Sequence, residues 1–184
     1  MVEMTVESVR INLATQQRVV ILRTTKQDRY LFIWIAPAEA YAIAVELQGN
    51  TSLRPLTHDL LKNVISELGA KIVSIVISDL IDDVYHARIV LDMNGRHVEI
   101  DSRSSDAIAL AVRTKTPIYV EESVLERGGV VPESTDDTQK RSLSKAEQRF
   151  MDREQAEADE EATNLDAYRD FINSLDALDE FGKD

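Results

Sequence analysis

Short runs of β-branched and aromatic residues, separated by turn residues, predict a β-sheet in the first two thirds of the chain. The runs RVVILRTT and RYLFIWI are typical of them. Asn94 and Gly95, between two such runs, form the usual signal of a two-residue hairpin turn. Strands are expected at residues 4–14, 18–25, 29–35, 70–80, 84–93, 96–101 and 116–120.

Apolar residues recur at helical spacing between these runs. Pro37 suits the first turn of a helix that Gly49 would end. The clearest helix is at residues 57–68, where Thr57 can serve as the N-cap and Gly69 ends the pattern. Its apolar stripe consists of Leu60, Leu61, Val64, Ile65 and Leu68. Further helices are expected at residues 104–115 and 121–129.

Part of the pattern repeats along the chain. Residues 29–45 (RYLFIWIAPAEAYAIAV) align with residues 96–112 (RHVEIDSRSSDAIALAV), so that Glu39 falls on Asp106 and several alanines coincide. We interpret this as two βββα units joined by the helix at residues 57–68; chance similarity of two alanine-rich segments is the alternative. The predicted fold class is α+β, a mixed β-sheet body with two central helices. Central packing would explain why AIALAV is apolar on every side.

The composition changes after residue 132. Residues 1–132 carry 14 Lys and Arg against 17 Asp and Glu, whereas residues 133–184 carry 7 against 16. We therefore expect a body at 1–131, a polar linker at 132–142 and an acidic, partly helical C-terminal tail at 143–184. Apolar residues at helical spacing near the end of this tail indicate that it docks on a surface, so a protein partner is expected.

The composition also excludes several classes of site. The chain has no cysteine, which excludes disulfides, thiolate metal sites and cysteine nucleophiles. It contains no P-loop, glycine-rich dinucleotide fingerprint, G-x-S-x-G elbow or H-E-x-x-H motif. The first residues, MVEMTVESVR, lack the pattern of a secretion signal, and no apolar run approaches the roughly 20 residues that span a bilayer. We therefore expect a cytoplasmic protein with no membrane partner.

Charged residues crowd ahead of an apolar helix in the stretch EIDSRSSDAIALAV. Asp101 and Arg103 share one strand face because they are two residues apart, and Asp106 follows in the first helical turn. Carboxylate oxygens are ligands for a hard divalent cation, and a guanidinium offers a fork of N–H donors to phosphate. The stretch therefore predicts a site for phosphate and a metal ion. A structural ion pair between Asp101 and Arg103 is the alternative.

The acids at the two helix starts also have a purely structural interpretation. If Ser104 or Ser105 caps its helix, Asp106 lies where free N–H groups and the helix dipole stabilise a carboxylate by about 0.3–1 kcal/mol. The same holds for Glu39 in the preceding unit. The clustering of Asp106 with other charges favours the site over this alternative.

His58 and Asp59 begin the helix at residues 57–68 in the sequence PLTHDL. Neutral imidazole titrates near working pH, so His58 is the candidate proton-transfer group. The alternative is an ordinary helix start in which Asp59 complements the dipole. His86 and His97 fall within predicted strands and are interpreted as sheet residues.

Several segments together resemble the bifunctional nuclease domain family. They are PLTHDLL, KIVSIVISDL, VYHARIVLD and, above all, EIDSRSSDAIALAVRTKTPIYV, whose counterpart in the family has the form E-[IV]-D-A-R-P-S-D-A-I-A-L-A. The resemblance covers roughly residues 1–130. It departs from the pattern at Ser102, Ser104 and Ala36, where alanine, proline and glycine are usual. The matching site positions are Glu39, Ala40, Thr57, His58, Asp59, Leu60, Glu99, Asp101, Arg103, Ser105 and Asp106.

The resemblance implies a dimeric body and cleavage of both DNA and RNA. In this first hypothesis the protein is a nuclease, a phosphodiester hydrolase that depends on Mg²⁺ or Mn²⁺. Asp101, Asp106 and Glu39 would be metal ligands, Arg103 and Ser105 would bind substrate, and His58, Asp59, Arg103 and Asp106 would be catalytic. The second hypothesis is a non-catalytic dimeric module whose acidic tail recruits a protein partner. The nearly balanced charge of the body favours the second, because sequence-independent nucleases gain affinity from neutralising phosphates.

Overall fold

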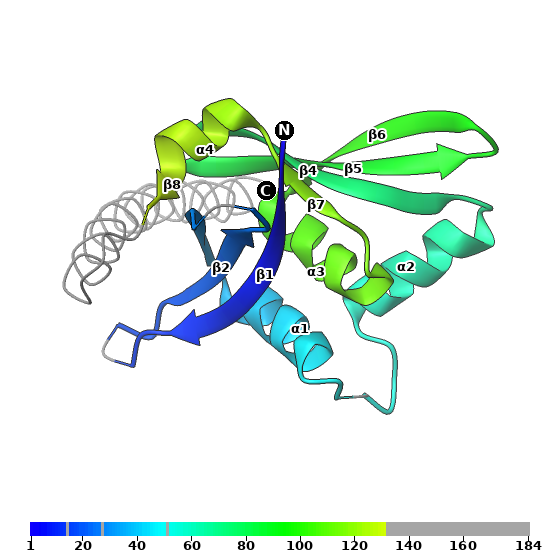
Figure 1. Cartoon of the computed structure of the whole chain (residues 1–184). Helices are drawn as coiled ribbons and strands as arrows, with labels where there is room; N and C mark the ends of the chain where they lie inside the picture. Colours follow the sequence, from blue (N-terminus) through cyan, green and yellow to red (C-terminus); the bar gives the residue numbers. More distant parts are fainter. Residues whose placement is uncertain (14, 27, 51, 132–184) are drawn as a thin grey trace, which may run out of the picture. The chain divides into compact units, whose positions relative to one another are not determined.

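The protein, seen here in a computed structural model, is described at residues 1–131 except residues 14, 27 and 51. Figure 1 shows the arrangement of its strands and helices. The strands are β1 (Val2–Ile11), β2 (Arg18–Thr24), β3 (Tyr30–Ile35), β4 (Lys71–Ile81), β5 (Val84–Met93), β6 (Arg96–Arg103), β7 (Ile118–Val120) and β8 (Gly129–Val130). The helices are α1 (Pro37–Leu47), α2 (Thr57–Glu67), α3 (Ser104–Thr114) and α4 (Glu122–Gly128).

The described strands form one mixed sheet in the order β6-β5-β4-β7-β1-β2-β3-β8. Within β1–β2–β3 and within β4–β5–β6 the neighbours are antiparallel. At the centre, β7 is parallel to β4 and antiparallel to β1. Each strand that the sequence predicts is present. The short strand β8, which pairs with Tyr30 and Leu31 of β3, is not among those predictions.

The two halves of the sheet have the same order of elements. Each consists of three antiparallel strands followed by a helix, β1–β2–β3–α1 and β4–β5–β6–α3, and α2 lies between them in the chain. The helices α1 and α3 pack against each other as well as against strands of the sheet (Figure 1). The predicted α+β body of two βββα units with central helices is therefore confirmed.

The helix α3 lies in the middle of the main apolar core. Ile108 and Leu110 on α3 and Ile43 on α1 have no accessible surface. They belong to one cluster with residues of the inner sheet face such as Leu22 and Ile75. Because apolar burial is the main favourable term in folding, the central helices and the sheet hold each other in place, and the helix starts become fixed points.

Two helix starts differ from the sequence-based expectation. Leu56 is the N-cap of α2 and Arg103 is the N-cap of α3, so the predicted caps at Thr57 and at Ser104 or its neighbour are wrong. In α2 the physical reason is the acid at the third position, which satisfies a donor at the helix start, whereas in α3 the acid at that position pairs with the side chain of the N-cap Arg103. In α2 the N–H of Leu56 donates to Asp59 Oδ2 at 2.8 Å.

The helix α2 is poorly buried for its length. His58 is its one buried residue, and Ile65 is partly buried against the core. The other four residues of its predicted apolar stripe, here called the α2 stripe, face outward. They are Leu60, Leu61, Val64 and Leu68, with exposed fractions of 58%, 39%, 43% and 72%. The apolar spacing predicts the helix correctly, but it does not reveal what the stripe contacts.

The predicted linker at 132–142 and the acidic tail at 143–184 lie outside the described residues, so their helical character stays a prediction. In the part of the chain that the structure describes, no helix combines the length and apolar character needed to cross a bilayer.

The central position of α3 leads to a stability prediction. Leu110→Ala removes a side chain with no accessible surface and is expected to lower the free energy of unfolding by about 2–5 kcal/mol. The matched control is Leu53→Ala, because Leu53 is 103% exposed; its effect should stay within about 0.5 kcal/mol. Urea unfolding followed by circular dichroism measures both, and equal losses in the two variants would contradict the central placement of α3.

Candidate functional site

The guanidinium of Arg103 joins the two helices that the repeat relates. Arg103 ends β6 and immediately precedes α3. Its Nη2 lies 2.7 Å from Glu39 Oε1 on α1, and its Nε lies 2.7 Å from Asp106 Oδ2 on α3. One side chain therefore pairs with an acid from each half of the chain.

Glu39 and Asp106 occupy equivalent positions in the two units. Each is the third residue of its helix and lies in the first turn. Unpaired backbone N–H groups and the helix dipole favour negative charge at this position. The repeat therefore brings two helix N-termini, each with its own carboxylate, to a single guanidinium.

His58 completes the cluster from α2. Its Nε2 lies 3.0 Å from Asp106 Oδ1, and the residue is only 8% exposed. An ionised carboxylate can only accept hydrogen bonds, so Nε2 carries the hydrogen and Nδ1 is the nitrogen that can take up a proton. The contact thus fixes both the tautomer and the orientation of the imidazole.

The charges of Arg103 and Asp106 are fixed by their contacts. Burial by itself would raise the pKa of the Asp106 carboxyl, but hydrogen bonds from Arg103 and His58 outweigh it and lower this pKa below its usual value. The hydrogen bond to Asp106 is also the main reason that the pKa of Arg103 is raised. Both groups therefore stay ionised around neutral pH, and the pair is ready to interact with a charged ligand.

One oxygen of Glu39 has no hydrogen-bond partner. Among the described residues, Glu39 Oε2 is one of few buried side-chain oxygens that have no hydrogen-bond partner. A buried polar atom without a partner costs about 1–3 kcal/mol. The atom lies on the carboxylate that faces Arg103, so a donor or cation entering the cluster would find an acceptor there.

A second ion pair fastens α2 to α3. Arg113 Nε donates to Asp59 Oδ1 at 2.7 Å, and Arg113 Nη1 donates to the carbonyl oxygen of Ala109 at 2.9 Å. The nuclease hypothesis makes Asp59 a catalytic residue together with His58. In the structure Asp106 contacts the imidazole, whereas Asp59 positions the start of α2.

Arg113 is the residue of this region that the sequence-based reasoning missed. Its side chain is 2% exposed, and a buried arginine needs a carboxylate partner. The sequence signal that could have found Arg113 is its place as a single arginine directly after the apolar run AIALAV. Burial would raise the pKa of Asp59, but the N–H of Leu56 and the guanidinium of Arg113 together lower it.

Asp101 and Ser105 lie beside the cluster. Asp101 is exposed on the edge strand β6, opposite Arg88 of β5. Ser105 is buried as the second residue of α3. The structure thus brings two of the three predicted metal ligands together at Arg103 and leaves Asp101 on the edge strand.

The oxygen donors suit Mg²⁺ or Mn²⁺, but the guanidinium fills the space between them. Both Asp106 oxygens and one oxygen of Glu39 already have partners. Among the residues that the structure describes, no group of three or more His, Asp and Glu side chains is arranged to hold a metal ion. A cation that used Glu39 and Asp106 would have to displace Arg103, and Glu39 Oε2 is the acceptor it would find unused.

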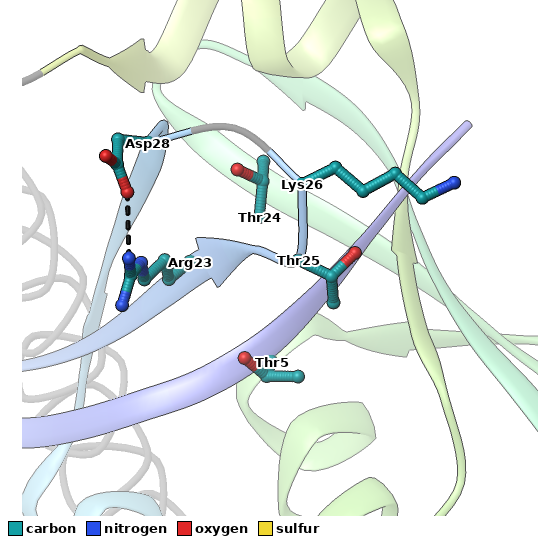
Figure 2. Close-up of a pocket in the computed structure, with 6 residues that line it drawn as sticks. All are labelled: Thr5, Arg23, Thr24, Thr25, Lys26 and Asp28. Carbon is teal, nitrogen blue, oxygen red and sulfur yellow. Dashed lines mark hydrogen bonds and ion pairs between the residues drawn. The ribbon is translucent and has the colours of Figure 1, made fainter.

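Two open hollows lie away from the cluster. The first, of about 440 Å³, is shown in Figure 2 and is lined by Thr5, Arg23, Thr24, Thr25, Lys26 and Asp28. Its arginine is bound to Asp28 at 2.8 Å. The second, of about 460 Å³, lies between β1 and the C-terminal ends of α1 and α3. Neither is lined by a residue of the cluster around Arg103, so the candidate chemistry lies elsewhere.

The fold and the site together define an α+β domain of two fused βββα units with a carboxylate–guanidinium–imidazole cluster where the units meet. The model of the bifunctional nuclease domain matches residues 20–133, which is more than half of the chain and includes the whole cluster. The chain belongs to the bifunctional nuclease domain family.

Similar proteins occur in bacteria and plants. An uncharacterized protein of Mycobacterium tuberculosis is 40% identical over 136 residues, which cover 73% of this chain and 81% of that protein. Bifunctional nuclease 2 of Oryza sativa subsp. japonica is 35% identical over 80 residues, 42% of this chain and 25% of the rice protein. Bifunctional nuclease 1 of Oryza sativa subsp. indica is 24% identical over 120 residues, 64% of this chain and 36% of its own length.

The lowered pKa of Asp59 leads to a prediction about acid stability. Its folded-state pKa lies below the value of the unfolded chain, about 3.9, so its pairing stabilises the fold above that pH and is lost as the pH falls through the folded-state pKa. Asp59→Asn should lower the free energy of unfolding at pH 7 by about 1–3 kcal/mol. The difference from the parent should shrink below about pH 4.

The matched control for this experiment is Asp28→Asn. Asp28 is paired with Arg23 in the open, with 69% of its side chain exposed, so its loss should cost less than about 1 kcal/mol. Urea unfolding at several pH values measures both variants. If Asp59→Asn were less stable than the parent by the same free energy at all pH values, including those below about 4, the carboxylate charge would not be the cause of the loss.

Proposed function

We propose that this protein is a nuclease that hydrolyses phosphodiester bonds of DNA or RNA. The observation that carries the proposal is the contact series from Glu39 through Arg103 and Asp106 to His58. It sets a guanidinium, which suits phosphate, beside an imidazole oriented by a carboxylate. Membership of the bifunctional nuclease domain family and the rice relatives of that name support it.

Hydrolysis of a phosphodiester needs a water oxygen to attack phosphorus while the bond to the leaving oxygen breaks. The side chain of Arg103 is 67% exposed and can meet a phosphate from solvent, where its N–H donors would stabilise charge on the phosphoryl oxygens. His58 would take the proton of the attacking water at Nδ1, and Asp106 would stabilise the imidazolium. The imidazolium or solvent would then return a proton to the leaving oxygen.

We also propose that the activity depends on Mg²⁺ or Mn²⁺. Glu39 and Asp106 would hold the ion, with Asp101 as the third ligand expected from the sequence, and a bound ion would supply a Lewis acid beside the phosphate. Ser105, at the start of α3, is proposed to contact substrate. Asp59 would act indirectly, because its pair with Arg113 positions the helix that carries His58.

The second candidate function is a non-catalytic dimeric module in which the cluster only joins the two units. The observation that favours it is the charge of residues 1–132, 14 Lys and Arg against 17 Asp and Glu, which gives little general attraction for nucleic acid. Under either function we propose that the acidic tail recruits a protein partner and that the protein acts in the cytoplasm.

We further propose that the chain forms a homodimer through the α2 stripe. A row of exposed aliphatic residues on one helix face is typical of an interaction surface. In an antiparallel pairing of α2 with its copy, the register that brings Leu61 to Leu68 of the partner subunit places Val64 next to the twofold axis. The face therefore complements itself in apolar pattern, as a twofold interface requires.

The nuclease proposal predicts the effect of Asp106→Asn. The change removes the charge that Arg103 and His58 both contact, so cleavage should slow by about 100-fold or more. Labelled single- and double-stranded DNA and RNA, incubated with Mg²⁺, Mn²⁺ or chelator, measure it. Asp101→Asn should slow cleavage similarly if Asp101 is a ligand.

Asp28→Asn, purified in parallel, is the control for contaminating nuclease because Asp28 lies in the hollow of Figure 2, away from the cluster. It should cleave like the parent. Cleavage by Asp106→Asn at the parent rate would show that the cluster is not the active site and would favour the non-catalytic module.

The dimer proposal predicts that Val64→Glu is monomeric. Val64 is 43% exposed in the single chain, so the glutamate is tolerated there but would bury its charge at the proposed interface. Size-exclusion chromatography with light scattering should give the mass of two chains for the parent and of one for the variant. Leu53→Glu, an exposed position outside the stripe, should stay dimeric. A monomeric parent at micromolar concentration would contradict the proposal.

A further inference from the structure

Arg103 is both the cation of the cluster and its most exposed member. Its side chain is 67% exposed, whereas the side chains of Glu39 and Asp106 are 11% and 27% exposed. The two acids are anchored in the first turns of helices packed in the core. Arg103 reaches them from the surface by a flexible stem. Its guanidinium can therefore turn away while the carboxylates stay in place.

A phosphate group competes with these carboxylates for the guanidinium, because the same fork of N–H donors binds either anion. When Arg103 turns toward a phosphate, Glu39 and Asp106 lose the cation that they share. Two carboxylates close together in a partly buried site repel each other. A divalent cation would offset both negative charges, whereas the guanidinium offsets one.

We infer that Arg103 is the exchangeable occupant of a divalent-cation site formed by Glu39 and Asp106, which opens when a nucleic-acid phosphate draws the guanidinium outward. The trigger in this inference rests on the proposed nuclease function. The inference adds to that function an order of binding: the nucleic acid binds first and frees the cation site, and the cation binds second. It also requires that substrate and cation raise each other's affinity by the same factor.

The unpartnered oxygen of Glu39 supports this inference independently of the ion pairs. Glu39 retains 9% of its accessible surface, and its Oε2 is buried without a hydrogen bond while Oε1 is held by Arg103. A cation bound to this carboxylate would satisfy the atom that the guanidinium leaves unused. Asp106 would contribute Oδ2, the oxygen that Arg103 releases, and would keep Oδ1 on His58.

Binding of Mn²⁺ alone tests the exchange without catalysis. Free Mn²⁺ is followed by its electron paramagnetic resonance signal during titration of the full chain and of Arg103→Gln. The variant lacks the competing charge, so it should bind Mn²⁺ at least about tenfold more tightly than the parent. Mn²⁺ should also raise the melting temperature of the variant more than that of the parent. Arg103→Ala should show the same gain, and Arg103→Lys, which keeps the charge, a smaller one.

Two further variants show whether the gain belongs to this site. Arg23→Gln removes another carboxylate-bound arginine, the one paired with Asp28 in Figure 2, and should bind Mn²⁺ like the parent. The double variant Arg103→Gln with Asp106→Asn should lose the gain. If both Arg103→Gln and Arg103→Ala bind Mn²⁺ no more tightly than the parent, Arg103 does not occupy a cation site. The inference is then wrong even if the parent cleaves nucleic acid.

The phosphate trigger is tested in the parent. A single-stranded DNA oligonucleotide should raise the affinity of the chain for Mn²⁺, after subtraction of Mn²⁺ bound by the oligonucleotide alone. A methylphosphonate oligonucleotide, which lacks the phosphate charge, should not raise it. Equal effects of the two would overturn the trigger. A tight Mn²⁺ site in Arg103→Gln, in a parent that cleaves no nucleic acid, would uphold the exchangeable site and reject the nuclease function.

Discussion

The pairing of Arg103 with Glu39 and Asp106 is the interaction on which the site depends. Two helices packed side by side in one core present their N-termini, and their first-turn carboxylates, at the same point. Like charges at such a place would destabilise the packing unless a cation lay between them. The guanidinium, 2.7 Å from each acid, supplies that cation and couples the two halves of the chain.

The repeat explains why one cation serves two acids. Arg103 is the N-cap of α3, and the equivalent N-cap of α1 is Ala36. Ala36 carries no charged group, so the acid of the first unit is paired with the guanidinium of the second. The remaining asymmetry comes from α2, which has no counterpart in the repeat and brings His58 to Asp106 but not to Glu39. A nearly symmetric scaffold thereby gains a site with one arginine, one histidine and two different carboxylates.

The elements of the fold followed from local pattern, because strands and helices have their own periods and stop signals. The turn at Asn94 and Gly95, both with positive φ, is such a case. The partners of the site residues did not follow. His58 contacts an acid 48 positions away, and Arg113 contacts one 54 positions away. Such contacts depend on how the helices pack against each other, and apolar spacing does not determine this packing. For the same reason, the spacing predicts helix α2 but not that the α2 stripe is exposed.

The members of the cluster differ in how firmly the fold holds them. Glu39 and Asp106 lie on the two central helices and cannot shift without disturbing the core. His58 is buried and held by Asp106, whereas the side chain of Arg103 is largely exposed. The carboxylates and the imidazole are therefore held firmly, while the guanidinium is the part that a ligand can rearrange. The proposed nuclease would use this division, because only the adjustable guanidinium would have to respond to substrate while the other groups stay in place.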